Sequence, residues 1–205
     1  MGRSFVLVVA TALLFAGCGG KTESRAADQW AKLHRPLRLP RLTRHARCPV
    51  SPVARHVPFR AYGVGQGLGP GPAYPVMSDA LEIEWPPPGL SEFFVGGWGG
   101  QRVLWFVAPG YRGPVLVRGR RLDGPDPVRF DRGRVPQIEL RIPAGDASFW
   151  PARITRDDGQ RYRRSYTRLR APGCYAYQVD GTTFSYRIVF RGVLGAETAP
   201  LTSTS

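Results

Sequence analysis

Short segments in which apolar and polar residues alternate, separated by glycine- and proline-rich turns, most strongly limit the folds open to this chain. In residues 184–190 every second side chain is aromatic or aliphatic, and residues 81–85 follow the same pattern. A period of two places one side of a β-strand against a core and the other side in water. The 205 residues include 25 glycines and 20 prolines, a composition that excludes a long helical bundle. We therefore expect an all-β protein.

About seven or eight short antiparallel strands can be placed on this pattern, and they predict a β-sandwich domain at residues 48–194. The run 103–107 is apolar on both faces, which is typical of a central strand. The turn residues 109–113 predict a hairpin with the following strand, and Asp180-Gly181 predicts a second hairpin. The expected strands cover residues 81–85, 103–107, 115–118, 137–142, 153–155, 166–169, 174–179 and 184–190.

One late segment carries a family resemblance. Residues 169–177 read Leu-Arg-Ala-Pro-Gly-Cys-Tyr-Ala-Tyr. Their Pro-Gly-x-Tyr step into a strand resembles the late hairpin of immunoglobulin-like domains, and it implies an immunoglobulin-like β-sandwich. The tyrosine corner of that family would place a tyrosine two residues before Cys174, where this chain has Pro172. The sandwich class hosts many functions, so it does not fix this one.

The N-terminus carries a targeting signal. Residues 5–15 form an uninterrupted apolar run, which is shorter than the ~20 residues of a membrane-spanning helix and predicts a signal peptide. The run ends in Phe15-Ala16-Gly17-Cys18, which resembles the lipobox of bacterial lipoproteins, although Phe15 stands where an aliphatic residue is usual. The resemblance implies a signal peptide at residues 1–17 and a lipid on Cys18, which would anchor the protein to a membrane on its extracytoplasmic side, at the cell surface or in the periplasm. Ordinary secretory cleavage is the alternative.

Positive charge is concentrated just behind this cysteine. Residues 21–60 hold ten basic and two acidic residues, out of a net charge of +14 for the whole chain. We interpret residues 18–47 as a flexible basic tether, which anionic headgroups would attract, and residues 195–205 as a disordered tail. Only two of the 29 basic residues are lysines, so the codon usage of a GC-rich genome is a second explanation for the arginines.

Two cysteines remain when Cys18 is set aside. An even number of cysteines in an exported protein predicts a disulfide, here between Cys48 and Cys174. The sequence has no CxxC redox motif and no Cys/His zinc spacing. Three histidines are spaced too widely for one helical face to gather them at a metal: His34, His45 and His56.

Catalytic patterns are weak, and we expect a protein that is not an enzyme and carries no cofactor or metal. No histidine follows His56, and no HExxH motif occurs. Glu82 and Glu84 share one strand face, either as a hydrolytic carboxylate pair or as the wet face of a strand. Three loop aspartates are calcium ligands or turn formers: Asp123, Asp126 and Asp131.

The candidate binding residues are aromatic and basic. Residues 93–102 either present Phe94, Trp98 and Arg102 for stacking or docking, or fold Trp98 back as a cap on the sandwich. Arginines of equal strand parity predict an arginine-rich sheet face, because a planar guanidinium binds phosphate or carboxylate through two hydrogen bonds. These pairs are Arg118 and Arg120, Arg168 and Arg170, and Arg187 and Arg191.

Three functions remain open at this point. The first is a membrane-anchored extracytoplasmic module that binds anionic lipid headgroups, acidic envelope polymers or an envelope protein. The second is an accessory subunit that docks on an envelope complex through the aromatic loop. The third is a glycan hydrolase that uses Glu82 and Glu84. Nucleic acid is not an expected partner, since an exported protein rarely meets it.

Overall fold

The computed structural model describes residues 29–83, 96–133, 135–145 and 158–195. They are almost entirely β-structure, so the expectation of an all-β protein is confirmed. No helix in these ranges is both long and apolar enough to cross a membrane. Apart from a helical turn at residues 29–33, the elements are η1 (Phe59–Tyr62), β1 (Ala73–Val76), β2 (Ala80–Ile83), β3 (Gly99–Val107), β4 (Val115–Arg121), β5 (Arg129–Phe130), β6 (Leu140–Ile142), β7 (Arg161–Leu169), β8 (Gly173–Gly181) and β9 (Ser185–Leu194).

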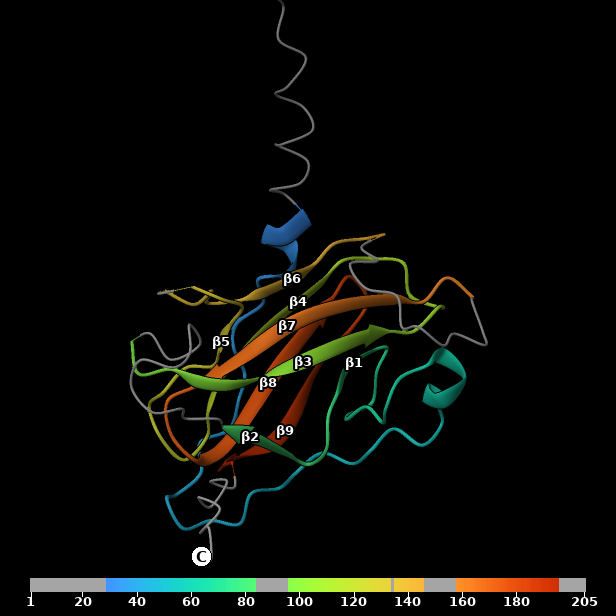
Figure 1. Ribbon diagram of the computed structural model, residues 1–205. Helices are drawn as coiled ribbons and strands as arrows, with labels where there is room; N and C mark the ends of the chain where they lie inside the picture. The colour runs from blue at the N-terminus through green and yellow to red at the C-terminus, as the bar shows by residue number, and fades with distance from the viewer. Residues whose placement is uncertain (1–28, 84–95, 134, 146–157, 196–205) are drawn as a thin grey trace, which may run out of the picture.

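The strands form two sheets packed face to face (Figure 1). The four-stranded sheet has the order β1-β3-β7-β5, and the five-stranded sheet has the order β2-β9-β8-β4-β6. β2 runs parallel to β9, whereas the other strand pairs in the two sheets are antiparallel. The sandwich is therefore present with nine described strands, and the expectation of a purely antiparallel one is wrong at the β2 edge.

One of the two expected hairpins is confirmed. β8 and β9 pair directly, with Asp180 opposite Ser185. The hairpin expected between residues 103–107 and 115–118 is wrong, because β3 and β4 belong to different sheets. Both strands contribute to the core between the sheets, Trp105 from β3 and Val117 from β4. The connection after β3 therefore carries the chain from one layer to the other instead of turning it back.

Aromatic side chains fill two cores, one on each face of β3. Between the sheets, Trp105 meets Tyr177 edge to face at 5.3 Å between ring centroids. On the outer face of the four-stranded sheet, Phe106 packs against Phe59 of η1, with 5.5 Å between their ring centroids. Because adjacent residues of a strand point to opposite faces, these two cores account for the doubly apolar run at 103–107.

The segment expected to be a flexible tether is folded from residue 30 onward. Residues 30–51, which we call the strap, cross the outer face of the five-stranded sheet, and Figure 1 shows them in blue behind the sheets. Leu33 is 1% exposed and packs with Trp30 against Leu116 of β4. The expectation failed because leucines lie between the arginines of the strap, and they cover an apolar strip of the sheet. The folded domain thus begins well before residue 48.

The expected Cys48–Cys174 disulfide is present and ties the strap to β8. Backbone hydrogen bonds hold the strap on either side of the disulfide. The Leu42 amide donates to the Leu122 carbonyl at 2.7 Å, and the Ser51 amide donates to the Val189 carbonyl at 2.9 Å. The strap is therefore an integral layer of the domain.

Candidate functional site

The arginines of β4 lie beneath the strap. Arg118 donates to a carboxylate oxygen of Asp180 at 2.8 Å and to the Arg35 carbonyl. Arg120 donates to the Leu39 carbonyl at 2.6 Å and to the Pro40 carbonyl at 3.1 Å. The expectation of an open arginine face is wrong for this strand, because strap carbonyls cover the face and accept these hydrogen bonds.

The remaining predicted arginines are divided between the two sheets. Arg187 and Arg191 are exposed on β9, where Arg191 pairs with Asp79 at 2.6 Å. Arg168, in the other sheet, is 1% exposed, and burial lowers its pKa. Parity correctly placed Arg118 and Arg120 on one face, but Arg170 lies past the end of β7, and the three strands do not form one continuous arginine surface.

Trp98 is folded back rather than presented to solvent. It is 6% exposed, its carbonyl accepts a hydrogen bond from Arg168, and the Arg170 guanidinium lies 4.5 Å above its ring. Of the two alternatives for this tryptophan, its burial contradicts the exposed one. Cys18, Glu84 and Phe94 lie outside the described residues.

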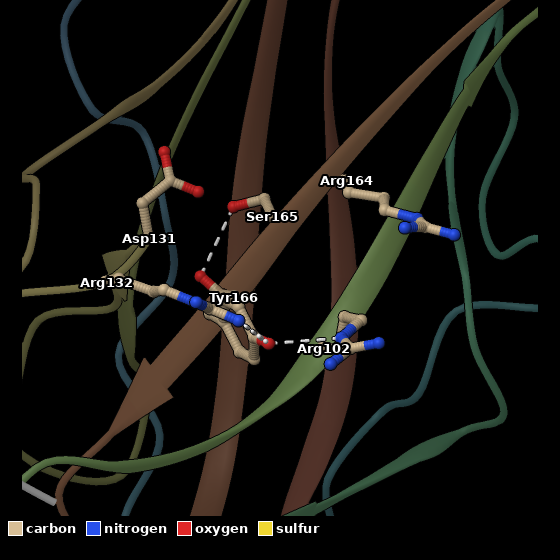
Figure 2. A pocket seen from close by; sticks show the side chains of 6 residues that line it. All are labelled: Arg102, Asp131, Arg132, Arg164, Ser165 and Tyr166. Atoms are coloured by element: carbon tan, nitrogen blue, oxygen red, sulfur yellow. Dashed lines mark hydrogen bonds between the residues drawn. The ribbon is translucent and has the colours of Figure 1, made fainter. Parts of the chain in front are cut away.

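The outer face of the four-stranded sheet carries a hollow of about 410 Å³. Its floor comes from β3 and β7, where Arg102 and Tyr166 are directly paired across the strands. We call it the arginine–tyrosine groove, and Figure 2 shows the six residues that line it: Arg102, Asp131, Arg132, Arg164, Ser165 and Tyr166.

Two guanidinium groups converge on one hydroxyl in this groove (Figure 2). Arg102 Nε and Arg132 Nη2 each donate to Tyr166 Oη at 3.1 Å. Their guanidinium carbons lie 5.6 and 5.3 Å from the centroid of the Tyr166 ring, within cation–π range. Partial burial alone would raise the pKa of Tyr166, but the hydrogen bonds and charges of the two arginines outweigh it and lower that pKa. The tyrosine thus fixes two cations side by side.

The described lining of the groove is rich in positive charge. Three arginines and one aspartate line it, and Asp131 also lies 3.8 Å from Arg163. Planar guanidinium groups bind carboxylate or phosphate oxygens through paired hydrogen bonds, and a tyrosine ring offers a stacking surface. The arrangement is suited to an anionic ligand that also has a flat or sugar-like surface.

The groove was only partly visible in the sequence. Arg102 was a candidate, but Arg132, Arg164 and Tyr166 were not. Arg164 and Tyr166 share the parity of Arg168 on one strand, so an extension of the same period-two argument could have found them. Arg132 lies in the loop after β5, and only the tertiary structure brings it to Tyr166.

The acidic candidates form no such arrangement. Glu82 borders a smaller hollow beside Gln101 and Arg102, and no second carboxylate from the described parts of the chain lines it. Asp123 and Asp126 both pair with Arg121 of β4, at 2.7 and 3.4 Å, which agrees with a role in turn structure. Across the described ranges, no three His, Cys, Asp or Glu side chains gather closely enough to hold a metal ion.

Two of the three histidines contact different partners, which belong to different parts of the fold. His34 lies 3.0 Å from Glu139, and His56 lies 3.1 Å from the Tyr74 hydroxyl. His45 is exposed on the strap. Each of the three histidines therefore has different surroundings.

No protein-family model matches the sequence, and no curated protein does. Among solved structures, the chain is similar to the crystal structure of a candidate lipoprotein from Bacillus anthracis. The two share 9% sequence identity and superpose with a TM-score of 0.42, over 72% of this chain and 88% of that one. A similarity of this size carries no argument about function, so the proposals below depend on the residues of this chain.

Proposed function

We propose that this protein is a lipid-anchored, extracytoplasmic binding protein that holds an acidic polymer of the cell envelope in the arginine–tyrosine groove. The observation that carries this proposal is the convergence of Arg102 and Arg132 on Tyr166 beside an open hollow. The role is recognition without chemistry, and the bound groups are carboxylates or phosphates of the polymer.

The proposed location depends on two cysteine features. The lipobox-like residues 15–18 imply lipid attachment at Cys18. The Cys48–Cys174 disulfide agrees with an oxidising compartment outside the cytoplasm. We expect Cys18→Ser to release the protein from the membrane fraction or to leave its signal peptide uncut. Normal maturation and full membrane retention of that variant would contradict lipid anchoring.

We infer that the sandwich is of the immunoglobulin-like type. The order β1-β3-β7-β5 corresponds to strands A-B-E-D of that fold, and β9-β8-β4 corresponds to G-F-C, with β6 as an added edge strand. The chain departs from the family in three ways, and the first is the parallel edge strand β2 beside β9. β5 precedes β6 along the sequence, which exchanges the order of the two edge strands. The disulfide joins a sheet to the strap rather than one sheet to the other.

The two other functions are not carried forward as proposals. Docking through an exposed aromatic loop loses its main residue, since Trp98 is buried under Arg170. For a glycan hydrolase, Glu84 lies outside the described residues, and no observation on Glu82 in the described lining of its hollow favours that chemistry.

The groove is tested by binding of the mature protein to polygalacturonate and to polyphosphate, with neutral dextran as the reference polymer. We expect the acidic polymers to bind, the affinity to fall with added salt, and the variant Arg102→Gln with Arg132→Gln to bind at least tenfold more weakly. The matched control is Arg55→Gln with Arg60→Gln. It removes the same charge from exposed positions outside the groove lining.

The outcome separates a defined site from general electrostatic attraction. A loss confined to the groove variant supports the proposal, and the polymer with the larger loss identifies the preferred anion. An equal loss in both variants would assign the binding to net charge, and equal binding of dextran would remove the anion requirement. Either of the last two results contradicts the proposed function.

A further inference from the structure

The strap is a strongly basic surface. From residue 29 to residue 78 the chain contains no Asp or Glu. Within the strap an arginine occurs at every third position: Arg35, Arg38, Arg41, Arg44 and Arg47. This spacing is much more regular than the distribution of arginines elsewhere in the chain.

The first arginine of this series differs from the other four. Arg35 lies 3.6 Å from the buried carboxylate of Asp180 and also donates to the Phe184 carbonyl, so it points into the domain. The other four are exposed. In the described part of the chain, none of their side chains has a hydrogen bond, an ion pair or a ring contact. We call Arg38, Arg41, Arg44 and Arg47 the arginine row.

The packing of the strap sets the direction of the row. Leu39 is 7% exposed. With Leu42 and Cys48, it packs against the outer face of the five-stranded sheet, where it meets Leu122 and Val189. Since these side chains occupy the inner side of the strap, the exposed arginines between them lie on its outer side. Leu37, 41% exposed, stands at the start of the row.

We propose that the arginine row lies against anionic phospholipid headgroups, so that the domain rests on the membrane with its strapped side down. The proposal rests on the lipid anchor of the proposed function. Twelve positions separate Cys18 from Trp30, so the start of the strap is at most about 40 Å of extended chain from the lipid. The nearest charge-complementary partner of four exposed cations at that distance is the headgroup layer itself.

A fixed strap can orient the domain, whereas a loose basic tether could only attract it. The disulfide and the backbone hydrogen bonds of Leu42 and Ser51 hold the strap in place on the sheet. The arginine–tyrosine groove belongs to the outer face of the other sheet, on the opposite side of the sandwich. With the strap on the bilayer, the groove therefore faces away from the membrane, toward the polymers of the envelope.

The expected effect is large at low salt. A cation near an anionic surface favours the docked orientation about fivefold, so removal of two arginines lowers the ratio of docked to undocked protein about 25-fold. The attraction is limited to roughly 8 Å at physiological salt, so high salt should abolish the preference.

The test measures, residue by residue, how fast phenylglyoxal modifies arginines in the mature protein purified from its membrane. The protein is placed in vesicles of phosphatidylcholine alone or of phosphatidylcholine with phosphatidylglycerol, and modification is read by mass spectrometry. We expect phosphatidylglycerol to slow modification of Arg38, Arg41, Arg44 and Arg47 several-fold. Arg102 and Arg164 in the groove should react at the same rate in both vesicles.

A pair of variants separates the row from overall charge. Arg41→Gln with Arg44→Gln should reduce the protection of Arg38 and Arg47, and Arg55→Gln with Arg60→Gln should leave that protection unchanged. Protection of the groove arginines instead of the row would mean that the groove is the membrane site, and uniform rates would mean no preferred orientation. Both outcomes overturn this proposal. Polymer binding by the groove is measured without vesicles, so failure of one proposal is distinguishable from failure of the other.

Discussion

Replacing Cys48 and Cys174 by alanine is expected to lower the free energy of unfolding by about 5 kcal/mol. The two residues are 126 positions apart, so the disulfide closes most of the folded domain into one loop. In the chain-entropy model a cross-link of this span removes enough freedom from the unfolded chain to account for about 5 kcal/mol at 25 °C. A domain is typically stable by only 5–15 kcal/mol, so the variant would keep little stability.

The packing lost with the two sulfur atoms adds less. Both cysteines contact a small apolar cluster between the strap and the sheet. Alanine keeps an apolar side chain there and leaves only a small cavity. The disulfide loop is therefore the main source of the expected effect.

Guanidinium denaturation followed by tryptophan fluorescence measures the difference, with the reduced wild-type protein as an independent control that should match the variant. Hydrogen exchange adds a local readout, because the amides of Leu42 and Ser51 should exchange faster than those between β8 and β9 once the strap is no longer tied down. A loss below ~1 kcal/mol at an unchanged denaturant slope would refute the reasoning, since the loop would then not limit the unfolded chain.

Four further changes test the cores and the groove. Tyr166→Phe should remove a tyrosine ionisation from the early part of an ultraviolet pH titration, because neighbouring arginines lower the pKa of Tyr166; identical curves would contradict this. Burial raises the pKa of Tyr175 from 10 to about 12. The stability that this tyrosine contributes is therefore complete below pH 10 and is lost between pH 10 and pH 12, at about 1.4 kcal/mol per pH unit. Denaturation curves measured over a series of pH values test this loss. Gly100→Ala would bring its Cβ within 2.1 Å of a β7 carbonyl and should lower Tm by several degrees, whereas Gly110→Ala has open space and should not. Leu33→Ala should cost about 2–4 kcal/mol in denaturation, and no cost would mean that the strap is loose.

Local pattern predicted most strands but failed where a neighbour decided the outcome. β1 was missed because residues 61–75 are rich in glycine and proline and so resemble an open loop, and Pro75 lies within the strand itself. A proline lacks the amide that a central strand needs, but β1 is an edge strand of its sheet, where that loss is tolerated. The hairpin predicted after β3 was wrong because the same short turn can either form a hairpin or carry the chain to the other sheet.

The candidate site was predictable only in fragments. Parity along a strand predicted one face for Arg168 and Arg170, but it could not show that Arg168 is covered, that Arg170 lies past the end of β7, or that Arg102 is open. The loop residue Arg132 follows no period at all, so its contact with Tyr166 exists only in the folded chain.

By itself, the sequence determined the class of the fold and one cross-link. Alternation predicts strands with one buried face, frequent glycine and proline predict turns, and an even pair of cysteines behind a predicted signal peptide predicts a disulfide between them. The tertiary structure alone decided which strands share a sheet, that the basic segment at residues 30–51 is a packed strap, and which arginines remain in contact with solvent. The physical reason is that a local period fixes the side of a strand on which a residue lies, whereas burial and pairing depend on which distant segment covers that side.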